Sequence, residues 1–248
     1  AGKGCGAMEA QFELLSEMAK NGDALNFWQD FYVKFYQAFL HADRWQQYFK
    51  GVGTTLLVTA IALVLGVVLG AIVAMIRVGH AQQKPHHRNP VLGVLNAVCK
   101  VYVTVIRGTP MMVQLLIMSM VIFASSRNFT MVGALALGIN SGAYVSEIIR
   151  GGLMAVDPGQ MEAGRSLGLN YMTTMFEIII PQAIRSILPA LGNEFIMLLK
   201  DSSLITVIGG KELLYAAQGI MNRTYEAMFP LLGVAAIYLV LVMLFSAL

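Results

Sequence analysis

Charge and cysteine are both scarce in this sequence of 248 residues. Charged side chains make up 12% of the chain and hydrophobic ones 57%, whereas roughly 25% of an ordinary soluble domain is charged. A soluble core cannot hide that much apolar surface, so the excess must face lipid or another apolar partner. Cys5 and Cys99 are too few to indicate a disulfide framework or a metal site.

Signals for nucleic acids, metals and nucleotides are missing as well. The net charge of +3 comes from few basic residues at the ends of apolar runs, which does not indicate a nucleic-acid partner. The run Gly209–Lys211 is followed by Glu212, so it lacks the Gly-Lys-Ser/Thr ending of a phosphate-binding loop. His80, His86 and His87 are interpreted as part of a solvated basic loop. We therefore expect no catalytic residue, no metal and no cofactor bound by this chain.

Five apolar segments predict membrane-spanning helices, because a helix needs about 20 residues to cross the hydrocarbon layer. The fold class that follows is an all-α integral membrane protein with about five transmembrane helices. The fourth segment is the least regular, because it carries Glu194, Lys200 and Asp201. The predicted spans are 52–76, 111–126 (extended backwards by the mixed stretch 91–107), 129–146, 183–208 and 227–248.

Basic residues predict the orientation of these spans. The loop after the first span and the segment after the third each carry three of them, and basic loops stay in the cytoplasm. The N-terminus is therefore expected outside and the C-terminal end inside. The residues concerned are Arg77, Lys84, Arg88, Arg150, Arg165 and Arg185.

Glycines occur at small-xxx-small spacing within two of the predicted spans. Gly66 with Gly70, and Gly138 with Gly142, are each four residues apart. Such spacing lets helices approach closely in lipid. We expect these glycines to serve ordinary packing inside a helix bundle.

Residues 1–47 have mixed polarity and form a separate segment in this prediction. Phe27, Phe31 and Phe35 recur every four residues, as on one helix face. An amphipathic helix with an aromatic belt is typical of the membrane surface, so an extracytoplasmic, interfacial segment is expected. Its first residues are open to three interpretations: a linker, a remnant of a fused binding domain, or an added sequence. Whether a basic tail follows Leu248 also stays open.

The stretch from Asp157 to Asn170 has clear helix signals at both ends. Asp157 is a good N-cap, Pro158 suits the first helical position, and Gln160 stands where a capping box places its reciprocal partner. Gly168 can end the helix in a left-handed conformation, and Asn170 can cap the next one. A short helix of about ten residues is therefore predicted in a cytoplasmic loop, outside the membrane.

This stretch resembles the cytoplasmic coupling loop of binding-protein-dependent ABC importer permeases. The family pattern is Glu-Ala-Ala, three residues, Gly, nine residues, Ile, any residue, Leu-Pro. Here Gly164 replaces the second Ala and Ile180 replaces Leu. The matching residues are Glu162-Ala163-Gly164, Gly168, Ile178 and Ile180-Pro181.

Four segments in order resemble the polar amino acid branch of that family, and the resemblance covers roughly residues 48–248. It implies an ABC importer transmembrane domain over 48–248, with the coupling loop at about 157–181. The segments are Arg107–Pro110 with Val113–Leu115, Ala143–Gly151, Gly159–Leu169 followed by Ile180–Arg185, and Leu199–Leu204.

The resemblance implies a permease subunit of an ATP-driven amino acid importer in the bacterial cytoplasmic (inner) membrane. Its implied partners are an ABC ATPase that binds ATP and Mg, a second permease copy or close homologue, an extracytoplasmic amino-acid-binding protein, the amino acid substrate and membrane lipid. The coupling helix would dock in a groove of the ATPase. The residues implied in coupling are Asp157, Gly159, Glu162, Ala163, Gly164, Gly168 and Pro181.

Charged residues at membrane depth suggest the substrate path, since each costs about 2.5–3.5 kcal/mol on insertion scales. A Glu194 carboxylate facing the path would favour a cationic amino acid; alternatively, Glu194 pairs with a neighbouring span or lies near the interface. Lys200 and Asp201 are interpreted as architecture or as contacts to the α-groups of the substrate. The predicted path residues are Thr55, Glu194, Lys200, Asp201 and Ser202.

Two other classes of protein compete with this interpretation. A secondary amino acid transporter driven by an ion gradient is the alternative, but it has no need of an ATPase docking element such as the capped helix at 157–168. A membrane-embedded enzyme would need His or Cys partners for Glu147, Glu194 and Asp201, and the spans provide none. The exact amino acid, and whether the permease pairs as a homodimer or a heterodimer, stay open.

Overall fold

The computed structural model describes residues 2–83 and 89–247, in which helices are joined by loops and no strand occurs. The described chain divides into two compact units. Unit 1 comprises Ala1–Thr55 and Lys211–Leu244, and unit 2 comprises Leu56–Gly210 and Phe245–Leu248. The all-α prediction is confirmed. The predictions for Lys84, His86, His87 and Arg88 lie outside the described residues.

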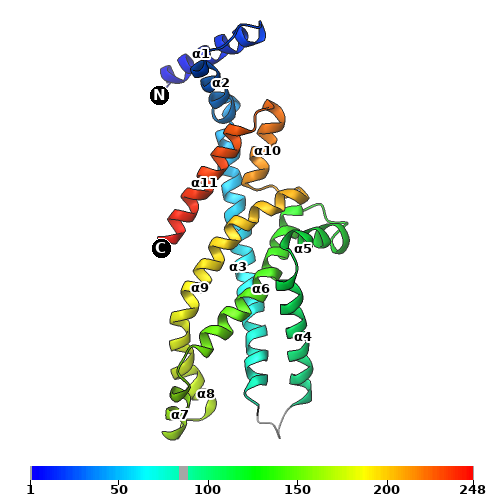
Figure 1. Ribbon diagram of the computed structural model, residues 1–248, viewed down its shortest axis with the longest axis vertical. Helices are drawn as coiled ribbons and strands as arrows, with labels where there is room; N and C mark the ends of the chain where they lie inside the picture. The colour runs from blue at the N-terminus through cyan, green and yellow to red at the C-terminus, as the bar shows by residue number, and fades with distance from the viewer. Residues whose placement is uncertain (1, 84–88, 248) are drawn as a thin grey trace. The chain divides into compact units, whose positions relative to one another are not determined.

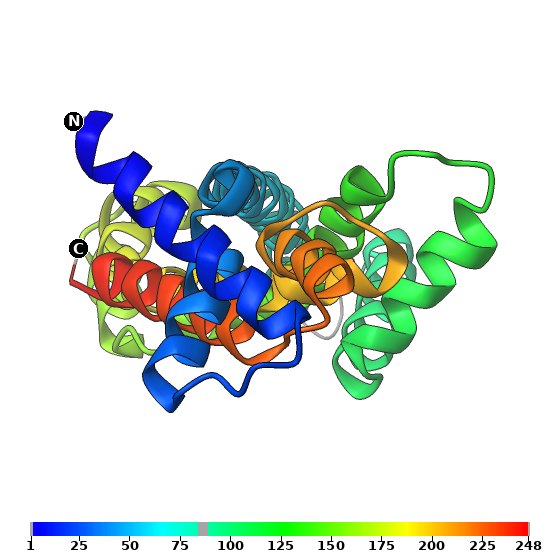
Figure 2. The same cartoon turned by 90° about the horizontal axis from the view of Figure 1, so that it is seen from above.

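Unit 1 contains a hairpin of helices before the first long helix. Its α2 begins at a capping box, in which the Asn26 N–H donates to the Gln29 side chain at 2.9 Å. A tight turn with positive φ at Ala42 and Asp43 separates α2 from α3. Figure 2 shows α1 and α2 of this unit, which pack together where Phe12 stacks on Tyr36. The helices are α1 (Gly2–Lys20), α2 (Phe27–Phe39), the first turns of α3 (Trp45–Ala81), α10 (Leu213–Thr224) and most of α11 (Met228–Ser246).

A buried carboxylate joins three helices of unit 1. Glu212 is almost fully buried, and one of its oxygens accepts a hydrogen bond from the Tyr215 N–H at 2.9 Å, which caps α10. The other oxygen accepts from the hydroxyls of Tyr238 on α11 at 2.9 Å and Thr55 on α3 at 3.4 Å. Thr55 also accepts from the Leu213 N–H at 3.3 Å. A single polar cluster therefore holds α3, α10 and α11 together.

Unit 2 packs its long helices around two apolar clusters, the second of which joins α4 to α3 and α6 through Val103, Val73 and Ala143. Figure 1 shows α4, α6 and α9 beside the part of α3 that belongs to this unit. The first cluster includes Val58 of α3, Leu137 of α6 and Leu198 of α9. The elements after α3 are α4 (Pro90–Gly108), α5 (Met111–Ile117), the π-helix η3 (Met118–Ile122), α6 (Phe129–Met154), α7 (Pro158–Ser166), α8 (Tyr171–Thr174), the π-helix η4 (Met175–Ile179), α9 (Ile180–Asp201) and the 3-10 helix η5 (Ser202–Ile208).

Five helical runs are long and apolar enough to cross a membrane, as predicted. They are His41–Ala81, Pro90–Gly108, Phe129–Met154, Tyr171–Ile208 and Met228–Ser246. The second predicted span is wrong in its position, because α4 is the spanning helix and Met111–Ile122 is a separate, shorter one. The break lies at Thr109, whose extended backbone (φ −119°, ψ 147°) is the conformation favoured before a proline.

Gln114 compensates for this break. Its amide nitrogen donates to the Ile106 carbonyl at 2.7 Å and to the Thr109 carbonyl at 3.1 Å, which α4 leaves unpaired at its end. Its amide oxygen accepts from Asn140 of α6 at 2.9 Å. Because unpaired backbone groups are costly in lipid, Gln114 allows the chain to turn there at membrane depth.

Glycines bring α3 and α6 into close contact in unit 2. A Cβ added at any of the four would lie 2.6–2.8 Å from a neighbouring side chain, closer than real Cβ contacts allow. The predicted packing role is confirmed, and the glycines of each helix face the other helix. They are Gly66 and Gly70 on α3 and Gly138 and Gly142 on α6.

A valine at Gly70 should therefore destabilise the protein. Its Cβ would lie 2.6 Å from Val145 Cγ1, so the helices must separate, and overpacking of this kind costs about 1–3 kcal/mol. We expect a lower thermal unfolding temperature in detergent for Gly70→Val. Gly79→Val is the matched control, because that glycine is on the same helix with nothing within 4 Å. Equal effects of the two substitutions would contradict the close-contact interpretation.

Candidate functional site

The helix α7 begins where the sequence predicts. The Asp157 carboxylate accepts a hydrogen bond from the Gly159 N–H at 2.7 Å, and Pro158 occupies the first turn. The predicted capping box is wrong, because Gln160 makes a different contact: its side-chain oxygen accepts from the Gln182 amide on α9 at 3.2 Å. The start of α7 is therefore capped by its own residues and attached to α9.

The end of α7 is a left-handed glycine turn, also as predicted. Gly168 has φ +83°, its N–H donates to the Arg165 carbonyl at 3.0 Å, and the Leu169 N–H donates to the Gly164 carbonyl at 3.1 Å. Gly164 itself is buried, and a Cβ there would lie 2.6 Å from the Thr174 side chain of α8. Gly164, one of the residues implied in coupling, therefore packs against α8 of the same chain.

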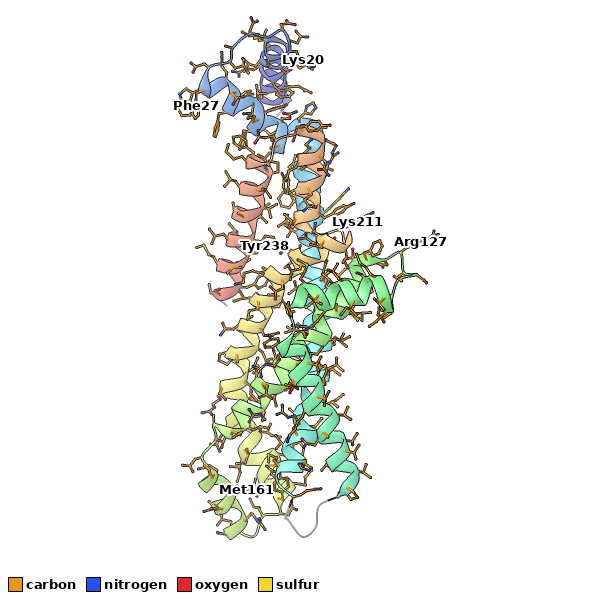
Figure 3. All side chains as sticks on the ribbon, turned by 45° about the vertical axis from the view of Figure 1, so that its right-hand side comes forward. Lys20, Phe27, Arg127, Met161, Lys211 and Tyr238 are labelled. Atoms are coloured by element: carbon orange, nitrogen blue, oxygen red, sulfur yellow. The ribbon has the colours of Figure 1, made fainter. Side chains whose placement is uncertain are left out.

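The outer side of α7 faces away from the rest of unit 2. Met161 marks the helix at one end of this unit in Figure 3. Glu162, Ala163 and Ser166 are exposed, and within the described chain the Glu162 carboxylate makes no ion pair. Leu167 is 80% exposed, the most exposed leucine among the described residues. Leu167 follows directly after the last residue of α7, as its C-cap.

The segment after α7 ties it to two long helices. Asn170 accepts a hydrogen bond from the Thr173 N–H at 2.8 Å and so caps α8, as predicted. The Tyr171 hydroxyl donates to Gln82, just after the end of α3. The helix then continues through the π-helical turn η4 into α9, where Pro181 lacks the N–H of a regular helix. Displacement of α7 would therefore act on both α3 and α9.

A second candidate site is an open pocket of about 390 Å³ between α4, α6 and α9. Glu194 lies in its wall, 7% exposed, and its carboxylate accepts a hydrogen bond from the Ser141 hydroxyl of α6 at 2.7 Å. Ser141 in turn packs against Gly66 of α3. The lining residues are Arg107, Tyr144, Glu147, Ile148, Ala190, Asn193, Glu194 and Met197.

The pocket carries charges of both signs. The Arg107 guanidinium lies 5.2 Å from the centre of the Tyr144 ring and, among the described residues, makes no ion pair. Glu147 is different, because it pairs with Arg77 of α3 and with Arg150, whose Nη2 lies 2.6 Å away. An exposed cation and the Glu194 carboxylate thus line the same pocket, a combination that suits a ligand carrying both an acid group and a cation.

The other predicted path residues do not line this pocket. Lys200 is exposed and Asp201 half-buried at the end of α9, and the buried Ser202 hydroxyl donates to the Leu199 carbonyl at 2.7 Å. Thr55 belongs to unit 1, where it is fully buried against Glu212 and Leu213. Glu194 is therefore the predicted path residue with pocket geometry, and the contacts of Thr55 and Ser202 are those of packing residues.

Three residues of the two candidate sites were not predicted as site residues from the sequence. Arg107 belongs to one of the family-like segments, but no binding role was predicted for it. Its position at the end of an apolar run is the sequence feature that could have indicated one. Leu167 is a large apolar residue directly before the glycine that ends a polar helix, which is an unusual place for one. Ser141 gave no signal, because its partner Glu194 is 53 residues away in sequence.

Comparison with known proteins adds an independent finding. Residues 91–248 match the family described as "Binding-protein-dependent transport system inner membrane component". The chain is 38% identical over 203 residues to a Rickettsia bellii protein provisionally named glutamine transport system permease protein GlnP, which covers 79% of this chain and 87% of the relative. It is 33% identical to the arginine transport system permease protein ArtQ of Bacillus subtilis, over 79% of this chain and 86% of the relative.

A solved structure is similar over most of the chain. It is entitled "Crystal structure of an amino acid ABC transporter with histidines", and the two chains share 41% identity at a TM-score of 0.73, over 82% of this chain and 90% of that one. An inward-facing MetNI methionine ABC transporter, at 20% identity and a TM-score of 0.68 over 81% of this chain and 92% of that one, shows the same fold.

The contact between Gly164 and Thr174 predicts that a larger side chain disturbs α7 at position 164 but not at the neighbouring position 163. Gly164→Val should separate α7 from α8, because its Cβ would clash with Thr174 at 2.6 Å. We expect faster amide hydrogen exchange across α7, measured by mass spectrometry. Ala163→Val is the control: it adds the same β-branched side chain at an exposed position and should leave exchange nearly unchanged. Equal acceleration in both variants would refute this arrangement.

Proposed function

The chain belongs to the family of binding-protein-dependent transport system inner membrane components, and we propose that α7 couples its transport cycle to a partner ATPase. As a member, it is a permease subunit of an amino acid ABC importer and not an enzyme, because the ATPase of these systems is a separate subunit. The alternative, a secondary transporter driven by an ion gradient, is not favoured by these relatives.

The observation that carries the coupling proposal is that one side of α7 is packed against its own chain and the other is exposed. Its inner side is fixed by the Gly164 contact with α8, its outer side carries exposed Glu162 and Ser166, and Leu167, directly after its last residue, is 80% exposed. A capped helix held at both ends passes on a displacement instead of absorbing it. When the ATPases close on ATP and Mg, the motion of the docked α7 would reach α3 through Tyr171 and α9 through Gln182. ATP and Mg would be bound by the partner ATPase.

The proposed orientation places α7 in the cytoplasm of a bacterium and the N-terminus outside. Supporting this, the end of α3 and the start of α8 touch through Gln82 and Tyr171, so the two basic segments lie at the same end of unit 2 (Figure 1). Arg77, Arg150 and Arg165 belong to these segments. Basic residues concentrated at one end are expected on the cytoplasmic side.

The other proposed partners follow from the architecture of such importers. A two-fold arrangement would pair this chain with a second copy or a close homologue, and an extracytoplasmic amino-acid-binding protein would deliver the substrate. The lipid bilayer surrounds the exposed apolar faces of the five spans.

The pocket between α4, α6 and α9 is the proposed amino acid site of the translocation path. Arg107 would attract the α-carboxylate of the substrate, and Glu194 would favour a cationic side chain. Relatives named for arginine transport, and a similar solved transporter described with histidines, agree with this preference. A relative provisionally named for glutamine transport points to a neutral substrate in the same family.

Exposed Leu167 supplies the test of coupling. Leu167→Ser should weaken the complex with the ATPase by roughly ten-fold or more, since burying a leucine side chain stabilises by about 1.5–3 kcal/mol. The measurement is the amount of ATPase that co-purifies from gently solubilised membranes, followed by transport-stimulated ATP hydrolysis. Leu14→Ser is the control, because Leu14 is a 61% exposed leucine of unit 1. Undiminished co-purification with Leu167→Ser would overturn the proposal.

Glu194 supplies the test of substrate preference. Glu194→Gln removes a charge-assisted contact worth about 1.5–3 kcal/mol, so uptake of arginine into proteoliposomes should fall by roughly ten-fold while uptake of glutamine persists. Glu177→Gln, at an exposed position of η4 in the same helical run, should change neither. A parallel loss of both substrates would assign Glu194 to the packing of α6 and α9 instead.

A further inference from the structure

The surface of α2 in unit 1 has three distinct sectors. One carries four exposed aromatic residues, with Trp28 the most exposed at 71%. Phe27 lies at the outer end of this helix in Figure 3. Neighbouring rings of this sector contact each other, with centroids 5.4–6.4 Å apart. Its members, here called the aromatic face, are Phe27, Trp28, Phe31 and Phe35.

The other two sectors already have partners. Tyr36 is buried and stacks on Phe12 of α1 at 4.8 Å, and Tyr32 donates to the Met8 carbonyl at 2.9 Å. The third sector is polar, with the Lys34 amine 2.7 Å from the Asp30 carboxylate, and this hydrogen bond raises the pKa of Lys34. The helix is thus covered by α1 on one side and charged on another, while the aromatic face remains open.

The spanning helix α11 fixes the depth of this face. With 19 residues it is roughly 28 Å long, close to the thickness of about 30 Å of the hydrocarbon layer. Phe229 lies in its first turn, so it belongs near one boundary of that layer. The Phe31 ring meets the Phe229 ring edge-on at 5.0 Å, and Phe35 lies 6.3 Å from it. The aromatic face therefore lies at the same depth.

We propose that the aromatic face of α2 inserts into the lipid bilayer at the boundary between headgroups and acyl chains. Aromatic rings are enriched at this depth, where an apolar ring can be buried while polar neighbours stay wet. Phe229 is itself buried, and its ring contacts hold Phe31 and Phe35 at the first turn of the span. The aromatic face contacts phospholipid, and α2 is an interfacial helix that lies along the membrane surface beside the span.

The two tryptophans of the chain allow a direct test. Trp45→Phe leaves Trp28 as the single tryptophan reporter, and this full-length variant is reconstituted into phosphatidylcholine vesicles. Lipids brominated near the headgroup end of the acyl chain should quench Trp28 emission most, lipids brominated near the chain terminus should quench it less, and aqueous iodide should quench it weakly. Trp28→Phe is the matched variant, in which Trp45 at the start of α3 reports the depth of a span boundary.

Two results would overturn the proposal. Strong iodide quenching of Trp28 without quenching by either brominated lipid would place α2 in water. A blue shift of Trp28 emission produced only by adding an extracytoplasmic binding protein would show that a protein covers the face instead. Preserved fluorescence quenching of Trp45 in the Trp28→Phe variant confirms that the reconstituted chain is folded, and arginine uptake reports separately on the proposed function.

Discussion

The close approach of α3 to α6 is the constraint on which the pocket between α4, α6 and α9 depends. Lipid offers little hydrophobic driving force between helices, so contact must come from small residues and polar pairs. Gly66 admits Ser141, and Ser141 then orients the Glu194 carboxylate toward the pocket. Further along the same two helices, Arg77 pairs with Glu147. Larger residues at the glycine positions would displace the pocket wall and these charges together.

The α7 region has the opposite design, in which a small polar helix is held by local hydrogen bonds and one close packing contact. Asp157 and Gly168 fix its two ends, and Gly164 fixes its inner side. The neighbouring π-helical turn and Pro181 mark the place where the helical run changes its hydrogen-bond pattern before entering the membrane.

Many features of this protein could be predicted from interactions between residues close together in the sequence. The five spans follow from run length, and the bounds of α7 follow from capping interactions between residues a few positions apart. The second span was misplaced because the apolar run 111–126 outweighed the break at Thr109 and Pro110, although a proline is a local signal. The family resemblance rested on the coupling loop and three further segments, and the matching family covers residues 91–248.

The sequence by itself determined the five apolar spans and the capped helix α7, because hydropathy and caps act within one helix, and its motifs indicated the permease family through their resemblance to it. Tertiary structure alone decided which polar groups meet. It gave Gly164 a partner within the chain, assigned Thr55 to the Glu212 cluster, and placed Glu194 beside Ser141 and near Arg107. These partners are distant in sequence, and their contact depends on how helices pack, which no single helix encodes.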